Sequence, residues 1–309
     1  MSLKSVKSKI KSIDKTRQVT KAMEAVSAVK MRKSQALAIG MRPYALAALT
    51  ILRNVSGSID AIKHPYLTPG TGTRTLIVVV TSDKGLAGNY GSSVLKRFYR
   101  LLKDESLSKE SVDLITIGRR GTEHFGKRGF TILAHYERWG DSVSLDDVGA
   151  LVSIVENAYR TGSYARVTIV YTNFISTLKQ DVYVRTLLPI AFASVEETVR
   201  GILPEHGKFS ELRESDAASA VPEITYEPSP EAVLAELIPM LFRIELYHSV
   251  LEANASEHSA RMIAMKNASD NARDISKALK LHFNKVRQAA ITREVSEIVG
   301  GMESMKVSE

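Results

Sequence analysis

The chain has 309 residues and contains no cysteine. This absence excludes disulfide bonds, thiolate metal sites and cysteine nucleophiles, and it favours a reducing compartment. The seven histidines are scattered and form no HExxH motif, so the sequence predicts no metal site. The longest purely aliphatic run is LIVVV at 76–80, far short of the roughly 18 residues that a membrane-spanning helix needs.

The first 33 residues also lack the features of a secretory signal. They are rich in lysine, poor in acidic residues and partly amphipathic, so an organelle transit peptide is the alternative interpretation. The helical pattern continues well past the usual length of such a peptide. We therefore interpret the segment as part of a long helix.

Acidic residues are scarce in this same segment, and positive charge is concentrated there. The net charge is +8, and residues 1–33 hold ten Lys or Arg against only Asp14 and Glu24. Removing these from the 42 basic and 34 acidic residues leaves 32 of each. The excess predicts an acidic partner surface, which could be protein, nucleic acid or anionic lipid; the alternative is a solvated helix face. No aromatic residue lies in the segment, which argues against stacking on nucleic-acid bases.

The N-terminal region, residues 1–57, is predicted to be a coiled-coil helix. Apolar residues recur at helical spacing from Leu3 to Val29, and the pattern resumes beyond Gly40 and Pro43. Because proline breaks or kinks a helix, the sequence leaves open whether one helix or two fill this region. A linker, HPYLTPGTGT at 64–73, follows.

The middle region, residues 74–205, alternates between strands and helices. This alternation predicts a Rossmann-like α/β domain with a mostly parallel sheet and a small antiparallel edge. The expected strands are 75–81, 113–117, 131–136, 167–171 and 182–188, and the expected helices are 90–102 and 145–159, with a short helix inside 118–129.

Residues 211–228 are a polar linker without periodicity, and residues 229–305 are predicted to be a second coiled-coil helix. Ser229 can cap this helix, with Pro230 at its first position. Neither proline nor glycine occurs between Pro239 and Gly300. Seventy helical residues extend about 105 Å, which a domain of this size cannot bury. The fold class is therefore α/β, with a long antiparallel coiled coil of the N- and C-terminal helices and an inserted Rossmann-like domain.

The two long helices are unequal, so the last stretch, 286–302, is expected to extend beyond the first helix. It still carries an apolar stripe, and such a stripe needs a partner around it. A frayed or folded-back tail is the alternative. The helix seams use Ala, Met, Ser and Thr more than Leu, which suits a part that changes its contacts. The stripe consists of Ile291, Val295, Ile298 and Val299.

The glycine-rich segment TSDKGLAGNYG, residues 81–91, lies between a strand and a helix, where phosphate can bind. Its spacing is G-x-x-G-x-x-G, which matches neither dinucleotide-binding nor P-loop fingerprints. The alternative is a strand-to-helix reversal in which Gly85, Gly88 and Gly91 supply positive φ or close packing. The residues therefore leave two functions open at this point: a nucleotide-dependent enzyme built on the middle domain, and a coiled coil that binds nucleic acid.

Three segments together resemble the gamma subunits of F-type ATP synthases: KSVKSKIKSIDKTRQVTKAMEAVSAVKMRKSQ, TSDKGLAGNYG and RQAAITREVSEIVGGMES. The last one follows the family pattern of Ile or Val, Thr, any residue, Glu, two residues, an acid, three residues, Gly and Ala. Met302 stands where Ala is usual. The matching positions are Ile291, Thr292, Glu294, Glu297 and Gly301.

The resemblance implies a rotor that performs no chemistry and holds no cofactor, metal or nucleotide. In the family, the two helices form a shaft inside a ring of three alpha and three beta subunits. The α/β domain lies against the epsilon subunit and the membrane c-ring, and rotation driven by ion flow changes the affinity of each beta site in turn. The implied location is the cytoplasmic face of the bacterial cell membrane, as a peripheral protein.

The resemblance also implies contact residues toward the alpha and beta subunits. Met23 lies where the shaft passes an acidic loop of beta, and Arg261, Gln288 and Thr292 match positions that contact loops of the head. Pairing the helices from residues 57 and 229 places Met23 opposite about residue 263, next to Arg261. The concentration of positive charge in residues 1–33 suggests three further contact residues, which are basic. The C-terminal motif suggests two more, which are acidic. The added residues are Lys30, Arg32, Lys33, Glu294 and Glu297.

Overall fold

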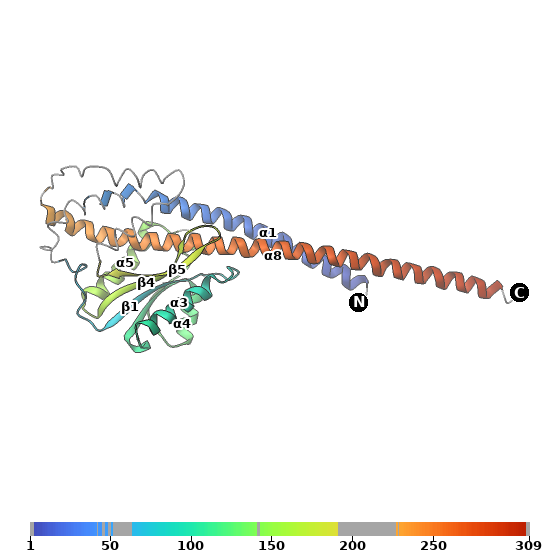
Figure 1. Ribbon diagram of the computed structural model, residues 1–309, viewed down its shortest axis with the longest axis horizontal. Coiled ribbons are helices and arrows are strands. Elements are labelled where there is room, and N and C mark those ends of the chain that lie inside the picture. The colour runs from blue at the N-terminus through green and yellow to red at the C-terminus, as the bar shows by residue number, and fades with distance from the viewer. Residues whose placement is uncertain are drawn as a thin grey trace. The chain divides into compact units, whose positions relative to one another are not determined.

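The computed structural model describes residues 3–41, 43–44, 47–48, 51, 64–140, 143–190, 227 and 229–306. It divides into two compact units (Figure 1). The helical unit contains Met1–Ser27 and Arg261–Glu309, and the domain unit contains Ala28–Ala260. Both long helices contribute residues to each unit, and the units are described separately.

The domain unit is built on a five-stranded sheet in the order β3-β2-β1-β4-β5. β1, β2, β3 and β4 are parallel, and β5 pairs antiparallel with β4 at one edge. This confirms the predicted parallel sheet with an antiparallel edge. The strands are β1 Arg74–Val80, β2 Val112–Ile117, β3 Thr131–Tyr136, β4 Tyr164–Phe174 and β5 Gln180–Leu188.

Helices cover both faces of this sheet. The central strand β1 alternates its apolar side chains between the faces, so its whole run is buried and reads as a continuous hydrophobic stretch. Leu76 and Val78 pack on the face shared with α5 and part of α8, whereas Ile77 and Val79 pack on the face shared with α3 and α4. The covering helices are α3 Tyr90–Asp104, α4 Arg119–Lys127, α5 Leu145–Arg160 and α8 Pro230–Lys306.

The helix starts follow their local sequence signals. Ser144 forms a capping box with Asp147 at the start of α5: the Asp147 amide donates to Ser144 Oγ over 3.2 Å, and the Ser144 amide donates to Asp147 Oδ2 over 2.8 Å. At the start of α8, the amide of Ala232 donates to Ser229 Oγ over 3.2 Å. The predicted cap at Ser229 is thereby confirmed, and the helix runs unbroken for 77 residues.

The first helix, α1 Leu3–Gly40, ends at the glycine where the sequence left its continuity open. Its packed face follows the predicted apolar stripe near the start, where Val6 is fully buried, and departs from it farther along the helix. Val19, Val26 and Val29 are 58%, 55% and 65% exposed, whereas Ser27 and Ser34 are buried. Small side chains let two helix backbones approach closely, so the seam follows size as well as hydrophobicity. The predicted linker at 211–228 and most of the continuation beyond Pro43 lie outside the described residues.

Candidate functional site

The polar groups of the glycine-rich loop have partners within the chain itself. Asp83 in this loop accepts a hydrogen bond from the backbone amide of Arg119, the first residue of α4, over 3.1 Å. Its second carboxylate oxygen accepts from the amide of Arg138 over 2.8 Å. The amide of Gly121 donates to Thr81 Oγ1 over 2.9 Å. A carboxylate of the glycine-rich loop therefore caps the start of α4, the helix that follows β2, and its negative charge within the loop disfavours a phosphate there.

The three glycines of the loop differ in their structural roles. Gly88 has a φ of +57°, as predicted for a chain reversal. A Cβ at Gly85 would lie 2.9 Å from Arg120 Nη2, which fits the predicted close packing. Gly91 has open space around it and no positive φ, so neither reason applies to it. The sequence also missed Gly118, where φ is +96° and a Cβ would lie 2.2 Å from the Thr81 carbonyl oxygen.

The carboxyl edge of the sheet, where open α/β sheets bind ligands, is contacted by the chain's own helix α8. Asn254 donates from Nδ2 to the Trp139 carbonyl over 2.8 Å, and His258 Nε2 donates to the Gly140 carbonyl over 2.6 Å. Both carbonyls belong to the loop that follows β3. Ser256 donates to the carbonyl oxygen of Thr172 near the end of β4 over 3.2 Å. This edge is therefore an attachment surface for α8.

In the helical unit, a polar contact joins α1 to α8. Ser276 Oγ donates to Asp14 Oδ1 over 2.8 Å, and Lys280 Nζ lies 3.4 Å from Asp14 Oδ2. The hydrogen bond from Ser276, followed by the charge of Lys280, lowers the pKa of Asp14 below its ordinary value. Because Asp14 contacts Ser276 and Lys280, the two helices pair antiparallel in this unit. This register differs by several residues from the predicted one, in which Met23 lies opposite about residue 263.

The buried residues of the helical unit are small or flexible, as the seam composition predicted. Large aliphatic residues are few among them. Methionine adapts its shape to its surroundings, and serine and alanine fill little volume. A seam of this kind stabilises the helix pair less than a leucine seam. Besides Arg261, the buried set along α8 in this unit is Met265, Ser269, Ala272 and Ser276.

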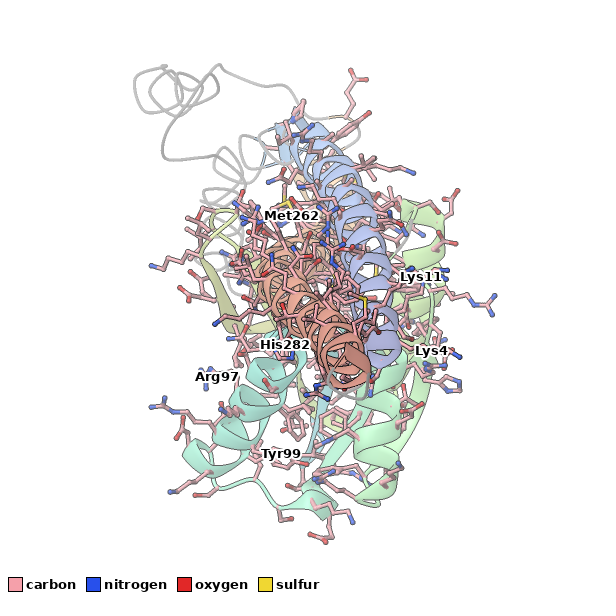
Figure 2. The ribbon with its side chains drawn as sticks, turned by 90° about the vertical axis from the view of Figure 1, so that its right-hand side faces the viewer. Lys4, Lys11, Arg97, Tyr99, Met262 and His282 are labelled. Carbon is pink, nitrogen blue, oxygen red and sulfur yellow. The ribbon has the colours of Figure 1, made fainter. Side chains whose placement is uncertain are left out.

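Both acidic residues of the basic segment have basic partners. Asp14 contacts Lys280, and Glu24 lies 3.0 Å from Lys21 Nζ. Figure 2 shows Lys4 and Lys11 on the side of α1 that faces away from α8. Lys4 and Lys11 therefore place positive charge on the outer face of α1, which fits the expected acidic partner surface.

The predicted contact residues lie along both long helices. On α1, Met23 and Lys30 are half-buried, and Arg32 and Lys33 are exposed. On α8, Arg261 differs from the others because it is only 7% exposed and is held within the chain. The remaining four residues of α8 are exposed, namely Gln288, Thr292, Glu294 and Glu297.

The end of α8 carries the predicted apolar stripe on its surface. In Figure 1 this end extends past the N-terminus of α1 within the helical unit. Exposed apolar residues at this density indicate a surface that a partner covers. No helix within the described residues carries an apolar stretch long enough to cross a membrane. The exposed residues are Ile291, Val295, Ile298, Val299 and Met302.

Comparisons with known proteins agree with the resemblance over nearly the whole chain. A family model described as ATP synthase matches residues 2–305. The chain is 38% identical to the ATP synthase gamma chain of Cytophaga hutchinsonii over 311 residues, covering 98% of this chain and 99% of that one. It is 36% identical to the ATP synthase gamma chain of Chlorobaculum tepidum over 308 residues, with 98% and 99% covered.

Solved structures show the same fold at lower sequence identity. A chain of the Euglena gracilis mitochondrial ATP synthase, from a structure of OSCP, F1 and c-ring, has a TM-score of 0.61 and 18% identity, covering 98% of this chain and 94% of that one. A chain of the Tetrahymena thermophila mitochondrial ATP synthase central stalk and c-ring has a TM-score of 0.57 and 23% identity, with 81% and 99% covered. With long helices at both ends, a central α/β domain and full-length relatives, the chain belongs to the ATP synthase gamma chain family.

Proposed function

We propose that the chain is the rotating central shaft of an F-type ATP synthase, and that it couples ion flow through a membrane c-ring to ATP synthesis on partner beta subunits. The observation that carries this proposal is the exposed apolar end of α8 in a chain related over its full length to gamma chains. An apolar stripe on an unpaired helix end needs an enclosing surface. A ring of three alpha and three beta subunits supplies one.

The shaft acts by contact rather than by chemistry. Its two helices are joined through a weak seam and present different side chains at each angle, so each beta subunit meets a different surface. A ligand or partner shifts a conformational equilibrium only through such differential contacts. The residues we assign to these contacts are Met23, Lys30, Arg32, Lys33, Arg261, Gln288, Thr292, Glu294 and Glu297.

The α/β domain is assigned to the epsilon subunit and the c-ring, which hold the protein at the cytoplasmic face of the bacterial cell membrane. The Asp83 carboxylate at the start of α4 and the attachment of α8 at the carboxyl edge of the sheet support a domain that binds no nucleotide. The catalytic sites are then those of the beta subunits.

Co-assembly tests this function directly. The chain is mixed with purified alpha and beta subunits, and we expect a complex with one copy of the chain and ATPase activity. A truncated variant that lacks residues 298–309 should also assemble, but in the complete membrane-bound complex it should mildly lower coupled ATP synthesis, because it removes Ile298, Val299 and Met302 from the enclosed end.

The truncation also separates the proposal from a folded-back tail. If the end of α8 packs on its own chain, the truncation should lower the melting temperature of the α/β domain. Loss of that fold, or failure of the complete chain to assemble with alpha and beta subunits, would contradict the proposed function.

A further inference from the structure

A carboxyl group lies inside the contact between α8 and the sheet of the domain unit. The side chain of Glu252 is only 12% exposed. Its neighbours along α8, Val250, Leu251 and Ala253, are fully or almost fully buried in the main core. Moving a charged carboxylate into such surroundings is costly unless it is paired and hydrogen-bonded.

Two strands face this carboxyl group. From β4, the side-chain amide of Asn173 lies against the carboxyl of Glu252. With Nδ2 toward it, the amide lies 3.1 Å from Oε1 and 2.5 Å from Oε2 and donates to an ionised carboxylate, whereas with Oδ1 toward it the amide accepts from a protonated one. The Tyr171 hydroxyl of the same strand is buried beside it. From β5, the Arg185 guanidinium lies over the ring of Tyr171, with Cζ 5.9 Å from the ring centroid.

The helix itself adds two more ionisable groups. His248 lies one turn before Glu252, and its Nε2 is 3.8 Å from Glu252 Oε1. Glu245 is buried on the same helix, and its charge acts on Tyr171. The cluster therefore contains two buried carboxyl groups, Glu245 and Glu252, together with the guanidinium of Arg185.

The environment favours the neutral form of Glu252. Burial raises the pKa of this carboxyl to about 8, although the charge of Arg185 and the hydroxyl of Tyr171 oppose the shift. Burial also raises the pKa of the Tyr171 hydroxyl, and the nearby charge of Glu252 adds to that effect. A neutral Glu252 can donate one hydrogen bond and accept others, which suits a buried position.

We propose that Glu252 is a proton-binding site that makes the attachment of α8 to β4 and β5 dependent on pH. With its proton bound, the carboxyl is a neutral group that packs between the helix and the strands. When the proton leaves to solvent, a negative charge remains inside the contact, and the segment 245–259 of α8 loosens from the sheet. That this loosening softens a rotating shaft at alkaline pH rests on the proposed function.

The sign of the effect follows from linkage. The folded protein binds the proton more tightly than the unfolded chain, whose glutamate titrates near its model value of 4.5. The stabilisation is complete below that value, falls as the pH rises, and is exhausted above the folded value of about 8. Within this window the opening equilibrium constant of the contact should rise about tenfold per pH unit.

Hydrogen exchange on the complete chain tests the proposal. Opening constants for amides of 245–259 are measured between about pH 5.5 and 9 and corrected for the intrinsic exchange chemistry. In the wild type, the opening constants should rise with pH and reach a plateau above about pH 8. Glu252→Gln, which keeps the shape and removes the titration, should make the constants independent of pH. Glu236→Gln alters an exposed glutamate of the same helix and should keep the wild-type slope.

A second measurement uses only the wild-type chain, so it does not depend on whether a variant folds. In chains carrying isotope-labelled glutamate, infrared spectra of the wild type should show a carboxylic-acid carbonyl band at neutral pH that disappears with a midpoint near 8. An ionised Glu252 at neutral pH, or an unchanged slope in Glu252→Gln, would overturn the proposal. Both measurements use the chain without partners, so their failure leaves the rotor assignment intact. Failure to assemble with alpha and beta subunits leaves the proton site intact.

Discussion

The α/β domain and the helical unit differ in what they bury. The domain encloses large side chains, including Phe98, Phe125 and Tyr171, between helices and a sheet that is covered on both faces. The helical unit buries mainly small or flexible side chains and leaves much of its apolar surface exposed. Close packing makes the first region rigid, whereas the second needs contacts from other chains to complete it.

The difference matches a division of labour within one chain. In the proposed function, a domain attached to a membrane ring would transmit torque without deforming, so a dense core suits it. A shaft inside a ring of partners would present changing surfaces to them, so a weak seam and an exposed basic and apolar surface suit it. Variants in the two regions should therefore differ in the size and kind of their effects.

The largest effect is expected in the aromatic core of the domain. The Phe98 ring is fully buried, and its centroid lies 4.6 Å from that of Phe125. Phe98→Ala should lower the free energy of unfolding by about 3–5 kcal/mol in urea denaturation. Met265→Ala in the helical seam should cost only about 1–2 kcal/mol, since that seam packs less surface. Equal losses at the two positions would contradict the comparison.

The next largest effect on stability is expected at Gly118, whose backbone conformation disfavours any residue with a side chain. Gly118→Ala forces a side chain into a φ of +96° and against the Thr81 carbonyl oxygen. We expect a loss of about 2–4 kcal/mol in stability, measured by thermal unfolding. Gly126→Ala is the matched control, because it lies in α4, the helix that Gly118 precedes, with nothing within 4 Å of the added Cβ. The control should be neutral or slightly stabilising, and a similar loss in both variants would refute the assigned cause.

The basic surface of α1 should affect coupling rather than stability. Replacing Lys30, Arg32 and Lys33 with Ala should lower coupled ATP synthesis about threefold at low salt, with a smaller difference at high salt where charges are screened. The control replaces three exposed lysines of the domain surface and should leave synthesis unchanged. An unchanged rate for the α1 variant at low salt would remove these residues from the contact surface. The control set is Lys96, Lys103 and Lys127.

The smallest effect is expected at the exposed contact between α1 and α8. Asp14→Asn weakens the pairing with Ser276 and Lys280 and should lower Tm by no more than about 2 °C at pH 7. The pKa of Asp14 is lowered in the folded chain, so its stabilisation is present above the ordinary value of 3.8 and is lost as the pH falls below it. A difference between variant and wild type that persists at lower pH would have another origin.

Most of the domain could be predicted from the sequence because its strands are short, apolar and separated by clear turns. The helix expected at 145–159 is α5 Leu145–Arg160, and the strand expected at 131–136 is β3. A continuous apolar run, as in β1, and an alternating pattern, as in β3, both leave a strong local signal, so these strands could be predicted without knowing their neighbours in the sheet.

The helix seam and the buried contacts could not be predicted in the same way. Val19, Val26 and Val29 follow helical spacing, yet their exposure depends on where the partner helix lies. The roles of Asp83 and Glu252 depend on residues far away in the chain, which a local pattern does not show. The predicted contact residues toward alpha and beta subunits remain predictions, because they concern chains outside this structure.

The most direct test of the rotor is to observe it turning. Because the chain has no cysteine, Ser108→Cys introduces a single labelling position on an exposed turn of the domain. A bead attached there, on a complex with immobilised alpha and beta subunits, should rotate in one direction when ATP is added. ATP hydrolysis by the complex while the bead only fluctuates about a fixed angle would contradict the account.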